Sequence, residues 1–349
     1  MAILNRRNIL IGSVVVLAGV AFEGRKRRHA PNLMTDGRRR SLRLIWPDCD
    51  TDPLALLATQ GSFDKYNLDV TLVNAAHGDA AIDALLGGRA DAAVSPLLDW
   101  LPRFHTVAPD QPMPGQLICG IEGSSYRVIV NRNLDIHHVA DLATRNIGVT
   151  RLDGADRRYL GIRLRRAALN PDQGVNWVAI PEHELDDALR TGRVDAIVAH
   201  DPLGWQILHQ TKGLGVSLLD SMSGAERRRI DQVVGLPGPS MTRDPGLAPA
   251  LILALRDAAQ HWDALKTAVA AALEQVPDGP DDPRGMLARE TPPHIVADHQ
   301  LVVQVAQYAD ELKLIGLVPE VEMSTKLARR LCAPRVEAPS NNPDDRQTG

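Results

Sequence analysis

Short apolar runs alternate with longer amphipathic segments along the first part of the chain. The runs LRLIW (42–46), LDVTLV (68–73) and ADAAV (90–94) have the length of buried strands. Between them, DPLALLATQG (52–61) and the segment from Asp79 to Gly87 have the pattern of helices. The order strand, helix, strand, helix, strand predicts three parallel strands in one sheet.

The same order returns later in the chain. A helical pattern runs from Gly154 to Ala168, and the stretch ALRTGRVDAIVAHDP (188–202) is a near copy of ALLGGRADAAVSP (84–96). The repeat therefore predicts two similar α/β units, and the copied stretch marks the third strand of each. The strands predicted for the second unit are NIGV (146–149), VNWVAI (175–180) and VDAIVA (194–199).

The ends of the predicted helices carry the residues expected there. Gly88 and Gly192 suit the left-handed exit of a helix, because glycine has no Cβ to clash. Asp52, Ser95 and Asp201 each follow a strand and precede a proline, so we expect them to cap helix N-termini. Helix N-termini at the carboxyl ends of parallel strands form a ligand-binding edge. Two such edges that face each other predict a cleft between two domains.

Composition and charge narrow the class of protein. The chain has 349 residues, of which 44% are hydrophobic, enough for two globular domains. Residues 1–43 hold ten Lys/Arg and two Asp/Glu, which leaves 29 basic and 41 acidic residues for the rest. The predicted domains are therefore acidic and lack the basic footprint of a nucleic-acid-binding protein. The three cysteines do not have the spacing of metal ligands.

The N-terminal segment has the pattern of an export signal. A twin arginine in NRRNIL precedes ILIGSVVVLAGVAF (9–22), an apolar run that is short for a membrane span of ~20 residues. We expect residues 1–41 to be a twin-arginine-type signal or anchor with a basic linker, and the protein to be periplasmic. An uncleaved anchor, or a start at Met34 and a cytoplasmic protein, are the alternatives, because more positive charge follows the apolar run than precedes it. Residues 334–349 are polar and proline-rich, which predicts a disordered tail.

Five segments within residues 42–319 resemble, in their order, the periplasmic substrate-binding proteins of the nitrate/sulfonate/taurine (NitT/TauT) class of ABC importers. They are GSFDKYNLDVTLV, ALLGGRADAAVSP, VADLATRNIGVT, GRVDAIVAHDP and YADELKLIGLVP. The resemblance implies a two-lobed, type II periplasmic-binding-protein-like fold, in which each lobe is a mostly parallel sheet flanked by helices. It also implies two crossings between the lobes, with lobe 1 formed by residues 42–120 and a helical return, 239–333, and lobe 2 by residues 121–238.

The same resemblance implies a function. Such a protein, expected to be monomeric, captures a small polar solute by lobe closure and delivers it to a membrane permease with its ATPase. It would touch the membrane only through its N-terminal segment or the permease. The alternative within the same fold is a cytoplasmic sensor of the nitrate/nitrite type that controls a regulatory partner.

The loop DTDPL (50–54) is similar to the Asp-x-Ala-Pro-Leu loop of nitrate- and bicarbonate-binding members, with Asp52 in place of the alanine. Asp48, Asp50 and Asp52 put three carboxylates at one lip of the expected cleft, beside Thr51, where a bare anion would be repelled. After the second strand this chain has NAAHGDAA, where nitrate-type members carry an aromatic residue. Both departures disfavour nitrate.

Arg151 and Gly154, near the start of a predicted helix, favour the opposite ligand charge. A guanidinium beside a helix N-terminus can bind a carboxylate, sulfonate or phosphate. The alternative is that Arg151 pairs with Asp153 or Asp156. If the acidic lip and Arg151 both face the cleft, a solute with a positive and a negative group, such as a taurine-like sulfonate, would satisfy both.

The other candidate ligand-binding residues follow predicted strands or lie near the expected crossing. Trp46 could stack on a solute, although a tryptophan at a strand end is as often part of the core. A structural role is the alternative for His200, and helix capping is the alternative for Asp52, Ser95 and Asp201. The candidates that could form hydrogen bonds to a solute are Ser95, Ser124, Ser125, Tyr126, His200 and Asp201.

Motifs for catalysis or for a cofactor are missing from the sequence. It has no glycine-rich phosphate loop, no nucleophile elbow and no His-Glu-x-x-His. The fold implied by the resemblance is also used by the pyrimidine synthase of thiamine biosynthesis, but the cysteine-rich active-site segment of that enzyme is not present. We therefore expect a binding protein without enzymatic activity, cofactor or metal.

Overall fold

The structure is a computed structural model that describes residues 37–123, 126–276, 279–290 and 292–334. The predicted export signal and most of the predicted tail lie outside the described residues, as do Ser124 and Ser125. Within the described ranges, no helix is both long and apolar enough to cross a membrane.

The first lobe is built on a six-stranded sheet with the order β11-β4-β10-β3-β1-β2. β1 pairs in parallel with β2 and β3, as the first repeat predicts, whereas β10 and β11 join antiparallel. The sheet is therefore mixed, with a parallel part made of the predicted strands. The strands are β1 Arg40–Pro47, β2 Leu68–Ala75, β3 Ala92–Pro96, β4 Gly115–Glu122, β10 Ile230–Pro237 and β11 His294–Val296.

The second lobe is built on a five-stranded sheet with the order β7-β6-β8-β5-β9. The second repeat supplies its parallel part, because β6 pairs in parallel with β7 and β8, while β5 pairs antiparallel with β8 and β9. The two repeats thus fold in the same way, as the sequence predicts. The strands are β5 Tyr126–Asn131, β6 Asn146–Val149, β7 Asn176–Ala179, β8 Ala196–His200 and β9 Gly215–Asp220.

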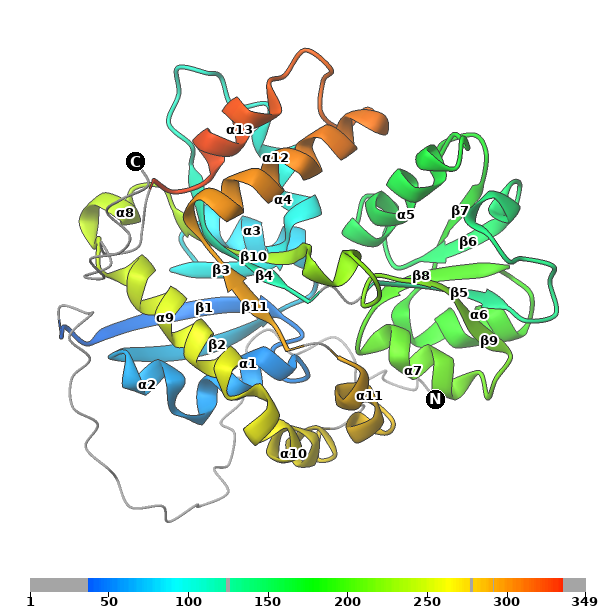
Figure 1. The fold of residues 1–349 in the computed structure, drawn as a ribbon, viewed down its shortest axis with the longest axis horizontal. Coiled ribbons are helices and arrows are strands. Elements are labelled where there is room, and N and C mark those ends of the chain that lie inside the picture. The colour runs from blue at the N-terminus through cyan, green and yellow to red at the C-terminus, as the bar shows by residue number, and fades with distance from the viewer. Residues whose placement is uncertain (1–36, 124–125, 277–278, 291, 335–349) are drawn as a thin grey trace, which may run out of the picture.

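Helices cover both faces of each sheet (Figure 1). In the first lobe, one face carries α3 Gly78–Leu86, α4 Leu97–Phe104, α12 Asp298–Leu314 and α13 Ser324–Leu331. The other face carries α1 Pro53–Leu57, α2 Phe63–Lys65, α9 Leu247–Gln260, α10 Trp262–Leu273 and α11 Pro283–Arg289, and α8 Ser240–Arg243 follows β10. In the second lobe, α5 Ala155–Arg166 lies on one face, and α6 Leu185–Arg190 and α7 Leu203–Gln210 lie on the other.

The chain passes between the sheets twice, from β4 to β5 and from β9 to β10. The two passages are held together, because the Tyr126 N–H donates to Ser221 Oγ (2.8 Å) and the Ser221 N–H donates to the Tyr126 carbonyl (2.9 Å). The boundary at residue 238 expected from the sequence lies beyond β10, a strand of the six-stranded sheet. We therefore propose that the second lobe ends near residue 229.

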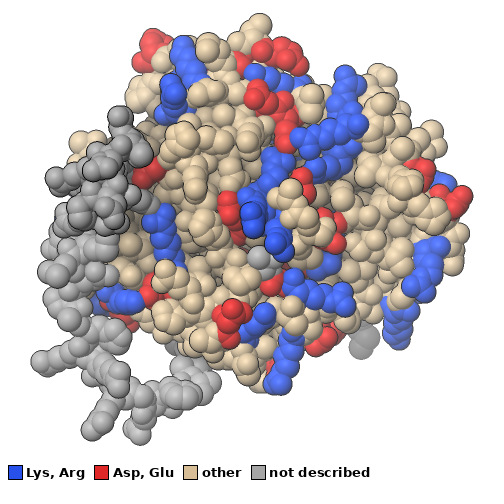
Figure 2. All heavy atoms as spheres, viewed as in Figure 1, with Lys and Arg blue, Asp and Glu red and all other residues tan. Residues whose placement is uncertain are grey.

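Ion pairs also join the lobes at the face drawn in Figure 2, where Lys and Arg side chains gather along the junction. Arg166 of α5 pairs with Glu311 of α12, and Arg229 binds both oxygens of the same carboxylate at 2.8 Å. Arg163 pairs with Glu226, in the passage from β9 to β10. The basic residues named here are therefore neutralised within the protein.

The predictions for helix ends are right at three of five positions. Gly88 and Gly192 have φ angles of 70° and 74°, and Asp52 Oδ1 caps α1 by accepting the Ala55 N–H at 2.8 Å. Ser95 does not cap a helix: it lies inside β3, fully buried, and its hydroxyl accepts from the indole of Trp100. Asp201 makes no cap because its carboxylate pairs with Arg127.

Trp100 ties α4 to the middle of the six-stranded sheet. Its ring is fully buried and stacks on Phe104 with ring centroids 4.9 Å apart. The ring lies directly over Gly235 of β10, where a Cβ atom would be 2.3 Å from Trp100 Cη2. Only glycine fits at this position of the strand. The contact fixes the β3–α4 junction, which forms part of the cleft described below.

We expect Gly235→Ala to lower the free energy of unfolding by about 1–3 kcal/mol, because the new methyl group overpacks the ring of Trp100. Gly148→Ala is the matched control, since its Cβ would meet neighbouring side chains at 3.4 Å, an ordinary contact distance. Urea denaturation of both variants tests this. Equal losses in the two variants would contradict it.

Candidate functional site

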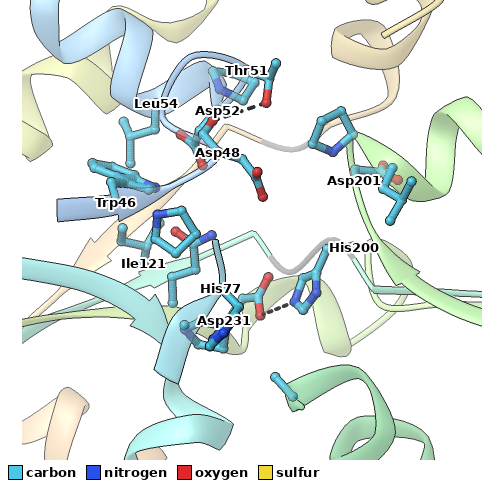
Figure 3. Close-up of a pocket in the computed structure, with 18 of the residues that line it drawn as sticks. Trp46, Asp48, Thr51, Asp52, Leu54, His77, Ile121, His200, Asp201 and Asp231 are labelled. Carbon is cyan, nitrogen blue, oxygen red and sulfur yellow. Dashed lines mark hydrogen bonds and ion pairs between the residues drawn. The ribbon is translucent and has the colours of Figure 1, made fainter. Parts of the chain in front are cut away.

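A cavity of about 380 Å³ lies between the two lobes (Figure 3). Its walls come from the segments that follow β1, β2 and β3 in the first lobe and β6, β7 and β8 in the second, together with β10 and the end of α11. The two sheet edges predicted from the repeats therefore face each other. In Figure 3, Trp46, Asp48 and Asp52 stand on one side of the opening, and His200 and Asp201 stand on the other.

Most of the residues predicted from the sequence line this cavity. Tyr126 and Ser95 do not, because both are buried behind its wall, and Tyr126 stacks on Tyr159 with centroids 4.3 Å apart. Ser124 and Ser125 lie outside the described residues. The predicted residues that line the cavity are Trp46, Asp48, Asp50, Thr51, Asp52, Arg151, Gly154, His200 and Asp201.

The loop after β1 is a tight turn that presents its acidic side chains to the cavity. Asp48 has a φ of 54°, and its carbonyl accepts the N–H groups of Thr51 (2.9 Å) and Asp52 (2.7 Å). The Asp48 N–H donates to Asn74 Oδ1 at 2.8 Å, which anchors the turn to β2. The conformation of this turn is therefore fixed by hydrogen bonds of its backbone and not by ion pairs.

Acidic side chains dominate the lining of the cavity, and Arg151 is the one Lys or Arg among the lining residues in the described part of the chain. Both lobes contribute carboxylates, so the negative charge surrounds the cavity. They are Asp48, Asp50, Asp52, Asp99, Glu122, Asp156, Glu182, Asp201, Asp231 and Glu290.

Some of these carboxylates are neutralised by neighbours. Arg127 binds both oxygens of Asp201, at 2.6 and 2.7 Å, and both side chains are nearly inaccessible to solvent. Arg158 of α5 pairs with Asp99 of α4, and this pair joins the two lobes. These two carboxylates are therefore part of the scaffold of the cavity.

The carboxylates of Asp48, Glu182 and Glu290 have no hydrogen bond or ion pair with the residues that the structure describes. Burial, together with the charges of Glu182 and Asp50, raises the pKa of Asp48 to about 6. Burial and the charge of Asp156 raise the pKa of Glu182. Burial, together with Asp201 and Asp52, raises the pKa of Glu290 to about 8. A carboxyl with a pKa of about 8 is mostly protonated at pH 7, so Asp48 and Glu182 carry the uncompensated negative charge of the cavity.

His200 joins the lobes at the base of the cavity. Its Nδ1 lies 2.6 Å from Asp156 in the first turn of α5, and its Nε2 lies 3.3 Å from Asp231 of β10. Burial alone would lower the pKa of His200, but the two carboxylates outweigh it and raise the pKa well above its ordinary value. The imidazolium is therefore an ionic bridge between the second lobe and the first, and the ring also contacts Tyr126.

Arg151 reaches from the second lobe to the start of α3 in the first. Its guanidinium lies 2.7 Å from Asp153, 3.4 Å from Asp79 and 2.9 Å from His77 Nε2. The pairing with Asp153 is the arrangement that the sequence offered as the alternative to ligand binding. Because carboxylates already surround it, Arg151 offers little positive charge to a solute.

Several lining residues were not predicted from the sequence. Asn74 lies at the end of β2, His77 follows that strand and Glu182 follows β7, so the rule that drew attention to the ends of the other strands would have found them. Asp231 and Glu290 come from β10 and from the residue after α11. No positional rule in the repeats points to them. The structure describes no group of three or more His, Cys, Asp or Glu residues that could hold a metal ion in its resolved ranges.

Comparisons with known proteins agree with this architecture. Residues 42–276 match the sequence model of the NMT1-like family. The nitrate/nitrite binding protein NrtA of Nostoc sp. is 21% identical over 233 residues, which are 62% of this chain and 52% of that protein. The chain thus spans about half the length of this curated relative.

Two solved structures share the fold. The periplasmic aliphatic sulphonate binding protein SsuA from Escherichia coli superposes with a TM-score of 0.69 at 16% identity, over 85% of this chain and 94% of that one. The alkanesulfonate-binding protein SsuA from Xanthomonas axonopodis pv. citri, bound to MOPS, superposes with a TM-score of 0.68 at 16% identity, over 83% of this chain and 98% of that one. The two-lobed fold expected from the sequence is therefore confirmed.

We expect His200→Gln to lower the free energy of unfolding by about 3 kcal/mol at pH 6, because it leaves Asp156 and Asp231 without their shared cation. The pKa of His200 is higher in the folded than in the unfolded state, so its ionic bridge stabilises the fold fully at pH values below the unfolded-state pKa. This stabilisation is lost as the pH rises through the folded-state pKa. The difference between wild type and variant should therefore shrink at high pH. Denaturation curves at pH 6 and pH 9 measure it.

His183→Gln is the control for this experiment, since the side chain of His183 is 66% exposed and lies outside the cavity. A destabilisation of His200→Gln that is the same at both pH values would rule out the imidazolium bridge.

Proposed function

The chain belongs to the NMT1-like family, and on this premise we propose that it is the solute-binding component of an ABC importer. It would capture a small polar solute in the cavity between the lobes and deliver it to a membrane permease that works with an ATPase. The relatives named above are binding proteins, which supports this role and supports the absence of catalysis.

The observation that carries the proposal is the cavity itself, which is lined by polar side chains from both lobes. A solute that contacts both walls stabilises the closed arrangement over the open one by the sum of those contacts. The permease would then recognise the closed shape. The two passages between the sheets are the natural hinge, because the remaining contacts between the lobes are side-chain contacts that can separate.

The periplasm is the proposed location. The named structural neighbour from Escherichia coli is periplasmic, and the twin-arginine segment of this chain is the proposed route of export. The names of the relatives give nitrate, nitrite or sulfonates as the ligands of those proteins. For this chain we propose a small nitrogen- or sulfur-containing solute, with taurine-like compounds among the candidates because they carry an amine as well as a sulfonate.

A thermal-shift screen with nitrate, nitrite, bicarbonate, taurine, alkanesulfonates, amino acids, polyamines and pyrimidines tests the proposed function. A ligand at ~100 times its Kd should add about 2.7 kcal/mol of stability and raise the melting temperature. We expect at least one hit, and we expect Thr51→Trp to abolish it by filling the cavity.

Thr71→Trp is the control variant, since Thr71 is an exposed residue of β2 away from the cavity. A hit that survives Thr51→Trp would place binding elsewhere. A folded protein that gives no hit with any compound would count against the solute-binding role.

A further inference from the structure

We propose that the solute carries a positively charged nitrogen group, and that this charge is what permits the lobes to close. The inference rests on the proposed function, because it assigns a ligand class to the same cavity. The proposed ligand class differs from the nitrate, nitrite and sulfonates in the names of the relatives. It is argued from the side chains of this chain.

The first observation is that unneutralised carboxylates stand on both sides of the cavity. Asp48 belongs to the loop after β1 in the first lobe, and Glu182 begins the turn after β7 in the second. The two are close enough for the charge of Glu182 to be the largest electrostatic influence on Asp48. Glu290, the residue after α11, is a third carboxyl group on this wall, and burial raises its pKa to about 8, so it is mostly protonated at pH 7. Closure brings like charges together.

The second observation is that no Lys, Arg or His among the described residues forms an ion pair with these three groups. Arg151 is held by Asp153 and Asp79, and His200 is shared by Asp156 and Asp231. Both of these cations are therefore already matched with two carboxylates. The compensating charge for Asp48 and Glu182 therefore has to arrive with the solute.

A third, independent observation comes from Trp262. Its side chain lines the cavity and is only 4% exposed, and its indole Nε1 has no hydrogen-bond partner among the described residues. A buried N–H without a partner is unfavourable, so this group is suited to donate to an acceptor that the solute brings. The site therefore fits a small organic molecule with a charged nitrogen and a hydrogen-bond acceptor, and not a bare cation.

Electrostatics then couple binding to closure. Without a solute, the carboxylates of Asp48 and Glu182 repel each other more strongly as the gap narrows and water leaves. A protonated amine or guanidine placed between them converts this repulsion into two attractions. An anion of the same size would add to the repulsion, so it would oppose closure.

Isothermal titration calorimetry of the full chain with ethanolamine, 4-aminobutanamide, methanesulfonate and nitrate tests the inference. We expect ethanolamine or 4-aminobutanamide, which carry a protonated amine and an oxygen acceptor, to bind and the two anions not to bind. Glu182→Gln should weaken the binding of the amine at least tenfold, because the substitution removes one charge from the wall of the cavity. Asp48→Asn should act in the same direction from the other lobe.

Glu184→Gln is the matched control. It makes the same substitution two residues away on the same turn, but Glu184 pairs with Arg193 and does not line the cavity. Its effect on amine binding should stay within twofold. Circular dichroism and melting temperature confirm that each variant is folded.

The outcomes separate the inference from the proposed function. Amine binding that is weakened by Glu182→Gln and not by Glu184→Gln supports the inference. Binding of methanesulfonate or nitrate in place of the amines overturns it, while the solute-binding function stands. Failure of both amines also overturns it, and failure of every compound in the thermal-shift screen counts against the function as well.

Discussion

The excess of carboxylates over cations in the cavity between the lobes is the constraint on which the other features of this molecule depend. The scaffold neutralises part of the charge with Arg127, Arg158 and His200, and these pairs also hold the walls in place. Outside the cavity, at the junction of the lobes, Glu226 and Glu311 form ion pairs with arginines of α5 and of the passage from β9 to β10. The charges that are left over are confined to the place where a solute can enter.

The fold could be predicted to a large extent, because the two repeats carry their own local signals. Apolar runs gave the positions of β1, β2, β3, β6, β7 and β8, and the resemblance to NitT/TauT binding proteins gave the two-lobed arrangement. The antiparallel strand β10 was not recognised as part of the first lobe. Its position between β3 and β4 depends on pairing with segments far away in the sequence, which no local pattern contains.

The site was predicted only where it follows the ends of the repeated strands. Asp48, Asp52 and His200 were found in this way, and each lines the cavity. Ser95 and Tyr126 show the limit of the rule: a polar residue at a strand end can also turn inward, as Ser95 does to accept the indole N–H of Trp100. Glu290 and Asp231 enter the cavity through tertiary packing. The role of Arg151 could not be predicted from the sequence either, because one of its ion-pair partners, Asp79, comes from the other lobe.

The position of β10 sets the order in which this protein can be completed during synthesis. The second lobe is one continuous segment whose two ends meet at Tyr126 and Ser221. The first lobe is divided, and a strand in the middle of its sheet comes from residues 230–237. As the chain leaves the ribosome, the second lobe therefore has all its strands before the first lobe can close its sheet. Until then β3 has one unpaired edge and β4 has two, because both neighbours of β4 come later in the chain, and the lobe that was begun first is the lobe that is finished last.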